Sequence, residues 1–106
     1  MVNSKNLIII PTYNEIENIL IVIDKVLNLT TIFDVLVVDD NSPDGTAKIV
    51  SHHMKKNESR IYLEVRKEKQ GLGKAYIHGF LWAIKNEYEY IFEMDADLSH
   101  DPKDLV

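Results

Sequence analysis

Short apolar runs alternate along this chain with longer segments in which apolar residues recur every three or four positions. Four short runs, each bounded by polar or turn-forming residues, are typical of buried β-strands: residues 7–10, 35–38, 61–65 and 90–94. The segments between them have helical spacing and predict three helices: residues 14–28, 46–56 and 74–86. The predicted order is therefore β-α-β-α-β-α-β.

This alternation predicts an α/β fold with an open parallel sheet and helices on both of its faces, which is a Rossmann-like arrangement. The run at residues 61–65 alternates apolar and polar side chains more than the others, which favours a place near the sheet edge. In open parallel sheets, ligands bind beyond the carboxyl ends of the strands. Polar residues follow the first, second and fourth runs, as PTYNE, DDNSPDGT and DAD. We expect the functional site there.

The first and third helices carry more detailed expectations. Asn14 is a suitable N-cap for the first helix, and Glu15 would suit the positive end of its dipole. In the third helix the spacing places four residues on one stripe that we expect to face the sheet: Tyr76, Phe80, Ala83 and Ile84.

Asp95 and Asp97 follow the fourth apolar run, two positions apart in a turn. Both carboxylates can reach one cation, and Mg²⁺ and Mn²⁺ prefer oxygen ligands, often one or two carboxylates together with substrate phosphates. A lone D-x-D is more often structural, with Asp97 capping a turn and Asp95 bonded locally. A second acidic cluster after the second strand shifts the balance towards a metal site.

That second cluster contains Asp39, Asp40 and Asp44. Asp40 could accept hydrogen bonds from a base or a ribose, as acidic residues after early strands do in nucleotide-binding folds. The alternative is a turn in which Asp, Asn, Pro and Gly serve backbone conformation alone. Asp44 could simply cap the helix that begins at Thr46.

The segment GLGKA, residues 71–75, invites a phosphate-loop interpretation but does not match the spacing. A Walker A loop needs Gly at position 68 and Ser or Thr at position 75, where Glu68 and Ala75 stand. The dinucleotide motif needs Gly at position 76, which is Tyr76. Gly71 and Gly73 are therefore expected to allow a tight entry into the helix and close packing.

Composition excludes several classes of protein. The 106 residues suffice for one domain, and the net charge of −5 disfavours binding to a nucleic-acid backbone. Cys is absent, which excludes disulfides and a thiolate nucleophile. The N-terminus does not resemble a secretory leader, and no apolar run approaches the roughly 18–20 residues of a transmembrane helix. We expect a cytoplasmic location, with any membrane contact peripheral and at the cytoplasmic face.

Four segments in one order resemble a known family: PTYNEIENI, VVDDNSPDGTA, QGLGKAYIHGF and EMDADLSHDP. Together they resemble the nucleotide-sugar-binding domain of family-2 glycosyltransferases with the GT-A fold, and within these the dolichol- and polyprenol-phosphate mannose synthases. Each segment alone is moderately specific, and four in register are highly specific. The resemblance covers nearly the whole chain.

The resemblance implies an inverting, metal-dependent transfer of a mannosyl group from GDP-mannose to a dolichyl or polyprenyl phosphate. It also implies Mg²⁺ or Mn²⁺ as the cofactor. By analogy with the family, five residues line the guanosine pocket: Pro11, Tyr13, Glu15, Val38 and Asp40. Asp95, Ala96 and Asp97 hold the metal and the pyrophosphate, with Asp95 and Asp97 as the D-x-D carboxylates on which catalysis depends.

The extent of the chain leaves alternatives open. The basic residues with which the family holds the donor phosphates have no counterpart here, so residues 1–106 are expected to be an incomplete nucleotide-sugar-binding part. A non-catalytic fragment that keeps only donor and metal binding is the main alternative. The uncovered fourth strand predicts association, including homo-oligomer formation through that sheet edge. A response-regulator receiver is a weaker alternative, since an additional strand and helix precede the acidic pair.

Overall fold

The computed structural model describes residues 5–55, 60–67 and 71–97. Seven elements follow one another in these ranges: β1 (Asn6–Thr12), α1 (Ile19–Leu27), β2 (Asp34–Asp39), α2 (Thr46–Met54), β3 (Ile61–Val65), α3 (Leu72–Lys85) and β4 (Tyr90–Glu93). The four strands form one parallel sheet in the order β3-β2-β1-β4. The predicted fold class is confirmed, and so is the edge position of β3.

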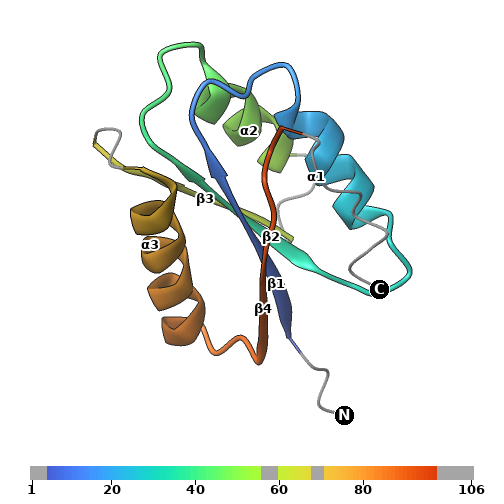
Figure 1. The fold of residues 1–106 in the computed structure, drawn as a ribbon. Helices are drawn as coiled ribbons and strands as arrows, with labels where there is room; N and C mark the ends of the chain where they lie inside the picture. Colours follow the sequence, from blue (N-terminus) through green and yellow to red (C-terminus); the bar gives the residue numbers. More distant parts are fainter. Residues whose placement is uncertain (1–4, 56–59, 68–70, 98–106) are drawn as a thin grey trace.

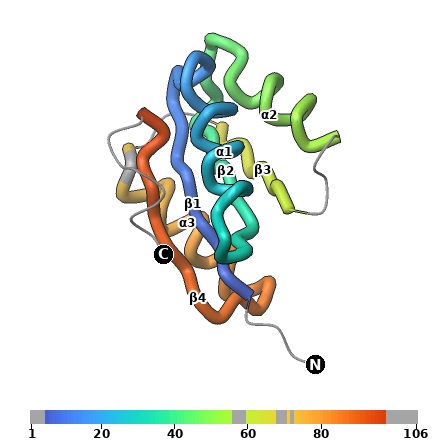
Figure 2. Tube along the Cα trace, turned by 90° about the vertical axis from the view of Figure 1, so that its right-hand side faces the viewer, coloured from blue at the N-terminus to red at the C-terminus, as the bar shows by residue number. Residues whose placement is uncertain are grey.

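Helices cover both faces of the sheet. Figure 1 shows α1 and α2 on one side of the strands and α3 on the other. In Figure 2, turned by 90°, β4 and β3 lie at opposite sides of the trace with β1 between them. Because parallel strands need a crossover connection, each successive pair is joined through a helix that must lie on one face or the other.

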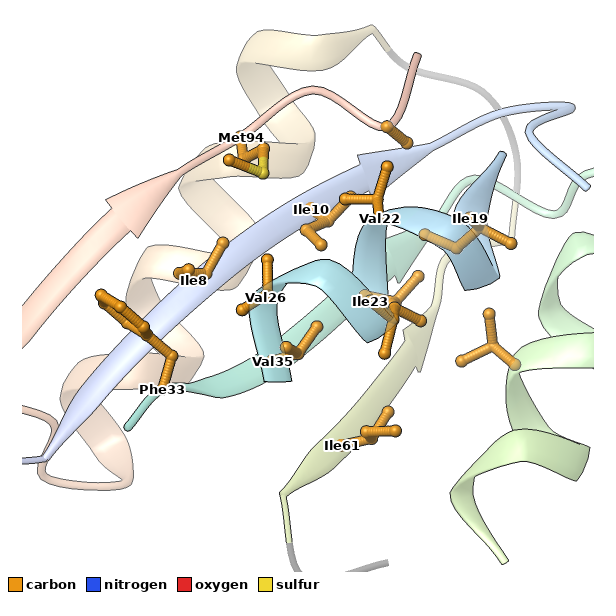
Figure 3. Close-up of a cluster of buried hydrophobic side chains, with 13 residues drawn as sticks. Ile8, Ile10, Ile19, Val22, Ile23, Val26, Phe33, Val35, Ile61 and Met94 are labelled. Carbon is orange, nitrogen blue, oxygen red and sulfur yellow. The ribbon is translucent and has the colours of Figure 1, made fainter. Parts of the chain in front are cut away.

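Successive residues of β1 supply the two halves of the core. Ile8 and Ile10 pack with α1 and α2, in a cluster that Figure 3 shows around Val26 of α1. Leu7 and Ile9 point to the opposite face and pack beneath α3. All four side chains are fully buried, which explains why the strand is a continuous apolar run and does not alternate.

β1 is longer than the predicted run of residues 7–10 and includes Pro11, which follows that run. The carbonyl of Ile9 accepts the N–H of Met94, so the alternate residues Ile9 and Pro11 present their backbone groups on the β4 side. The register of β1 with β4 ends at Ile9. In the described part of the chain, no strand lies beside Pro11 where its N–H would point, so its missing donor breaks no ladder bond.

The predicted start of α1 at Asn14 is wrong. Asn14 has a φ of 58°, in the left-handed region, and the N-cap is Asn18. Glu15 precedes the helix and does not lie in its first turn; its carbonyl accepts the N–H of Ile19. Side chains of the loop after β2 and of the start of α2 accept the backbone N–H groups of residues 14–16. These tertiary hydrogen bonds override the local helical preference.

The predicted orientation of α3 is wrong for two of four residues. Phe80 and Ile84 are exposed, whereas Ala83 is buried and Tyr76 partly so. The face towards the sheet carries small residues, because α3 lies very close to β1 and β2. A Cβ added to Gly79 would lie 2.7 Å from Cγ2 of Ile9.

In the described part of the chain, no helix has the length and apolar character to cross a membrane.

Replacing Gly79 by Ala is expected to lower the free energy of unfolding by about 1–3 kcal/mol, through overpacking against Ile9. Gly73 is the matched control in the same helix, since a Cβ there meets no atom within 4 Å. Gly73→Ala should stabilise the protein by up to about 1 kcal/mol, because Ala is the better helix former. Urea denaturation followed by circular dichroism measures both, and equal shifts of the same sign would contradict the close approach of α3.

Candidate functional site

The three polar segments that follow β1, β2 and β4 meet at one edge of the sheet. Pro11 stands opposite Val38 in the parallel register, and Thr12 stands opposite Asp39. The N–H of Asp40 donates to the carbonyl of Thr12 at 3.0 Å, so the two strands stay paired as they leave the sheet. On the other side of β1, the N–H of Met94 bonds to Ile9, which brings the D-x-D turn beside the same strand.

Asp39 joins the loops after β1 and β2. Its carboxylate is fully buried and accepts the hydroxyl of Thr12 at 2.6 Å, the N–H of Ser42 at 2.9 Å and the hydroxyl of Ser42 at 2.6 Å. The Ser42 hydroxyl oxygen accepts the N–H of Asn14 at 2.9 Å. Asp39 therefore serves the shape of the site, and its burial leaves no carboxylate oxygen turned towards a ligand.

Two further side chains accept hydrogen bonds from the backbone at the end of the PTYNE segment. The N–H of Glu15 donates to the hydroxyl oxygen of Thr46 at 3.1 Å, and the N–H of Ile16 donates to Asp44 at 3.2 Å. Asp44 also accepts the N–H and the hydroxyl of Thr46, the first residue of α2. The N-cap of α2 is Gly45 and not Asp44, so Asp44 bonds the first residue of the helix from the position before the cap. The same carboxylate positions the loop that carries Tyr13 and Glu15.

The pKa of Asp44 is lowered from its ordinary value. Burial acts in the opposite direction and raises it, but the hydrogen bonds from the Thr46 hydroxyl and from the N–H groups of Ile16 and Thr46 outweigh that effect. All of these donors favour the ionised carboxylate. The ionised form of Asp44 therefore stabilises the folded state.

Replacing Asp44 by Asn is expected to lower the free energy of unfolding by about 1 kcal/mol at pH 7, because hydrogen bonds from Ile16 and Thr46 to a charged acceptor are replaced by weaker ones to a neutral amide. Since the folded-state pKa lies below 3.8, the contribution of the charge is fully present above that pH and is lost as the pH falls through the folded-state value. Urea denaturation at a series of pH values should show the wild type and variant converging below about pH 3.8. A difference that persists undiminished in acid would exclude this role.

Asp40 forms an ion pair with Arg66, the residue that follows β3. Nε of Arg66 lies 3.2 Å from Oδ1 of Asp40, and both side chains are more than nine-tenths buried. The N–H of Arg66 also donates to the carbonyl of Asp39 at 2.7 Å. Arg66 thus fixes the carboxylate that family resemblance places beside the guanosine. The motif spacing did not indicate Arg66. A basic residue directly after an apolar strand could have indicated a partner for the acidic residues at the same end of the sheet.

Asp95 is positioned by Tyr76 of α3. The Tyr76 hydroxyl donates to Oδ1 of Asp95 at 3.1 Å. Burial raises the pKa of Tyr76, and the charge and hydrogen bond of Asp95 raise it further, followed by the charges of Glu93 and Asp97. The phenol therefore remains a proton donor at neutral pH and holds one oxygen of Asp95. Tyr76 was predicted only as an apolar contact to the sheet, so sequence reasoning missed this polar role.

The D-x-D turn fits a cation that is shared with a ligand. Asp95 is half-buried, Ala96 is buried and Asp97 is exposed. Among the described residues, no group of three or more acidic, His or Cys side chains could hold a metal by itself. Two carboxylates in a turn suit Mg²⁺ or Mn²⁺, which often take one or two protein carboxylates and complete their shell with substrate phosphates and water.

The remaining predicted residues occupy the edge as expected. Pro11 and Val38 are buried in the strands, whereas Tyr13 and Glu15 are half-buried in the loop that follows β1. The segment LSHDP, which follows the D-x-D carboxylates in the fourth matching segment, lies outside the described residues. The structure therefore brings the segments of the predicted site to one edge, on three neighbouring strands.

Comparison with known proteins assigns the family. The family model described as glycosyl transferase family 2 matches residues 7–106. Polyprenol monophosphomannose synthase from Mycolicibacterium smegmatis is 42% identical over 101 residues, which cover 95% of this chain and 38% of that protein. Undecaprenyl-phosphate mannosyltransferase from Micrococcus luteus is 44% identical over 99 residues, which cover 93% of this chain and 40% of that protein. The chain thus spans about two-fifths of the length of these relatives.

Solved structures agree on the fold. A mannosyltransferase from Pyrobaculum calidifontis, in complex with GDP-Man and Mn²⁺, has a TM-score of 0.74 at 26% identity, over 91% of this chain and 28% of that one. S. aureus TarS residues 1–349 have a TM-score of 0.75 at 28% identity, over 89% of this chain and 28% of that one. The receiver alternative is therefore wrong, because the additional strand and helix with PTYNE lie within the matched region. The chain belongs to glycosyl transferase family 2, and its sheet is the Rossmann-like part of a GT-A fold.

Proposed function

We propose that residues 1–106 are the nucleotide-sugar-binding part of a polyprenol-phosphate mannosyltransferase. The reaction is transfer of a mannosyl group from GDP-mannose to a dolichyl or polyprenyl phosphate. One observation carries this proposal. Hydrogen bonds join the PTYNE and DDNSPDGT loops, and these loops lie at the same end of the sheet as the D-x-D turn. The names of the two relatives support the acceptor class, and the ligands of the P. calidifontis structure support the donor.

The nucleoside occupies the side of the site formed by β1 and β2. Pro11 and Val38 form the buried base of this part of the site, because they are neighbours in the register of β1 and β2. Tyr13, Glu15 and Asp40 supply the polar and aromatic groups that select the guanosine. Because Arg66 holds Asp40 in place, the carboxylate is set before the donor arrives, which limits the entropy lost on binding.

The pyrophosphate end of the donor lies at the turn formed by Asp95, Ala96 and Asp97. Asp95 and Asp97 would hold Mg²⁺ or Mn²⁺, and Tyr76 keeps Asp95 in position. When bound, the cation stabilises the negative charge that develops on the departing nucleoside diphosphate. Asp95 and Asp97 are catalytic in this sense, because they would hold the cation at the departing diphosphate.

The acceptor is already a nucleophile at neutral pH. Its phosphate has a second pKa of about 6 by analogy with phosphorylated side chains, so an oxygen anion is available without a strong general base. Attack on the anomeric carbon from the side opposite the leaving group inverts the configuration.

A non-catalytic chain that only binds donor and metal is the second candidate. The chain spans 38–40% of the two relatives. Donor binding depends on β1, β2 and β4, which are all described. Among the described residues β4 has a neighbouring strand on one side only, so a second copy could pair along its outer edge.

Calorimetric titration with GDP-mannose tests the donor site. With Mn²⁺ present we expect measurable binding, weakened at least tenfold when the metal is removed or when Asp97 is replaced by Ala, because the cation links the carboxylates to the pyrophosphate. Glu89→Ala is the matched control, an exposed carboxylate just before β4 at the opposite edge. Equal affinity with and without Mn²⁺ would remove the metal from the proposal.

Turnover separates the two candidates. Radiolabelled GDP-mannose and a short polyprenyl phosphate are incubated with Mn²⁺, and the lipid product is extracted. Transfer of the label to the lipid, with loss in the Asp97→Ala variant, supports the transferase. Donor binding without transfer supports the binding-only alternative.

A further inference from the structure

One side-chain hydrogen bond joins α3 to the D-x-D turn. The hydroxyl of Tyr76 donates to Oδ1 of Asp95 at 3.1 Å. A phenol has a single hydrogen to donate, so this bond engages one oxygen of the carboxylate and not both. The two oxygens of Asp95 are therefore unequal before any cation arrives.

The apolar core fixes the ring that carries this hydroxyl. Tyr76 packs against the buried cluster beneath α3, which includes Leu7 and Ile9 of β1. The helix lies directly on this cluster, since a Cβ added to Gly79 would be 2.7 Å from Cγ2 of Ile9. Close-packed side chains keep one arrangement, so the hydroxyl is held at a set position beside the turn.

The backbone on the other side of the bond is also fixed. The N–H of Met94, the residue before Asp95, donates to the carbonyl of Ile9 at 3.0 Å, and Met94 is buried. Asp95 is half-buried, whereas Asp97 is exposed. Asp95 is thus held both through the backbone that leads into it and at one carboxylate oxygen.

A carboxylate that is held by one oxygen favours one-oxygen binding of a cation. Ca²⁺ takes roughly 6–8 oxygen ligands in a flexible shell and often uses both oxygens of a carboxylate. Mg²⁺ demands an octahedral shell at about 2.0–2.1 Å, usually with one or two carboxylates, and Mn²⁺ suits the same oxygen ligands. The phenol hydrogen competes with a cation for Oδ1, so it disfavours two-oxygen binding and leaves one-oxygen binding intact.

We propose that Tyr76 sets the ion preference of the D-x-D turn, by holding Asp95 as a one-oxygen ligand that favours Mg²⁺ and Mn²⁺ over Ca²⁺. This inference rests on the proposed function, in which Asp95 and Asp97 hold the cation, and it adds the residue that selects the cation. Tyr76 touches neither donor nor cation in this scheme and is a positioning residue. Removing such an outer partner of a metal ligand typically changes metal affinity about 10–100-fold.

A hydrogen bond that serves stability alone is the alternative, and the chain offers a matched control for it. At the opposite end of the sheet, the hydroxyl of Tyr88 donates to Oδ2 of Asp34 at 2.7 Å. Asp34 is the first residue of β2, so this pair lies at the amino ends of the strands, away from the D-x-D turn. Tyr76→Phe and Tyr88→Phe each remove one hydroxyl from a part-buried tyrosine–aspartate pair.

Calorimetric titration with GDP, at saturating Mn²⁺ or at saturating Ca²⁺, measures the ion preference. Because the cation links the turn to the diphosphate, the ratio of the two GDP affinities reports which ion the site prefers. The wild type should bind GDP at least tenfold more tightly with Mn²⁺ than with Ca²⁺. Tyr76→Phe should lower this ratio about tenfold, whereas Tyr88→Phe should keep it. Urea denaturation checks that both variants are folded.

Three results would overturn the inference: equal GDP affinity of the wild type with the two cations, an unchanged ratio in Tyr76→Phe, and equal falls of the ratio in Tyr76→Phe and Tyr88→Phe. The last result would trace the effect to stability. GDP binding that needs no metal in the wild type would remove the metal site, and the role of Tyr76 with it. Metal-dependent binding with an unchanged ratio in Tyr76→Phe would leave the proposed function standing and remove the role of Tyr76 alone.

Discussion

Replacing Asp40 by Ala is expected to lower the free energy of unfolding by about 3–5 kcal/mol, because the variant leaves Arg66 buried without its counter-charge. The Arg66 side chain is 8% exposed, and its Nε lies 3.2 Å from the Asp40 carboxylate. Its backbone N–H is held by Asp39, so the residue cannot easily swing outwards. Urea denaturation followed by the fluorescence of Trp82, the one tryptophan, measures the change.

The second variant of this test removes both charges. Asp40→Ala combined with Arg66→Met replaces the buried pair by apolar groups and should recover most of the lost stability, since burying two ions is itself costly. The single Arg66→Met change should be nearly as destabilising as Asp40→Ala, because it leaves a buried carboxylate. If the double variant loses the sum of the two single losses, the ion pair does not couple the residues.

The same double variant separates stability from ligand binding. If Asp40 receives the guanosine of the donor, recovered stability will not restore affinity for GDP-mannose. Arg66 acts on the donor only through Asp40 and is a positioning residue in this scheme. An Arg66→Lys variant keeps the charge but loses the planar guanidinium, and should retain more donor affinity than Arg66→Met.

Much of the fold follows directly from local pattern. Each strand in the middle of the sheet is buried on both faces, so β1 and β2 appear in the sequence as unbroken apolar runs. β3 has a neighbour on one side only, and its alternation predicted that edge position correctly. The site edge was predictable for the same reason, since carboxyl ends of parallel strands converge and the polar segments follow three of them.

The remaining features depend on contacts between distant segments. No helical pattern reveals that Ser42 and Thr46 bind the backbone of Asn14 and Glu15, and these bonds delay the start of α1. In α3 both sides are apolar, so periodicity could not tell which side meets the sheet. Small residues decide it, because Gly79 lets the helix approach Ile9.

Acidic residues in one cluster could not be ranked from the sequence. Asp39 ends β2, and Asp40 and Asp44 follow it, but only their partners reveal their roles. Asp39 and Asp44 bind hydroxyl and N–H groups of the surrounding loops, whereas Asp40 faces a buried cation. Arg66 lies 26 positions after Asp40, beyond the reach of any local motif.

Replacing Asp39 by Ala is expected to lower the free energy of unfolding by about 3 kcal/mol or more. The variant loses three hydrogen bonds to a charged acceptor and leaves the hydroxyl of Thr12 and the N–H of Ser42 without it. Since Ser42 also accepts the N–H of Asn14, the loss should loosen the PTYNE loop in addition to β2. Hydrogen exchange of the Asn14 amide reports the loosening, and urea denaturation reports the stability.

Asp39→Asn is the conservative variant for this test. It keeps the shape and one carbonyl oxygen, and the Thr12 and Ser42 hydroxyls can reverse and accept from its amide, so about 1 kcal/mol should be lost. Exchange of the Asn14 amide should rise much more in Asp39→Ala than in Asp39→Asn, and donor affinity should fall in the same order. Unchanged exchange at Asn14 in Asp39→Ala would mean that the Thr46 and Asp44 contacts alone hold the loop. The buried carboxylate would then act on β2 without shaping the donor site.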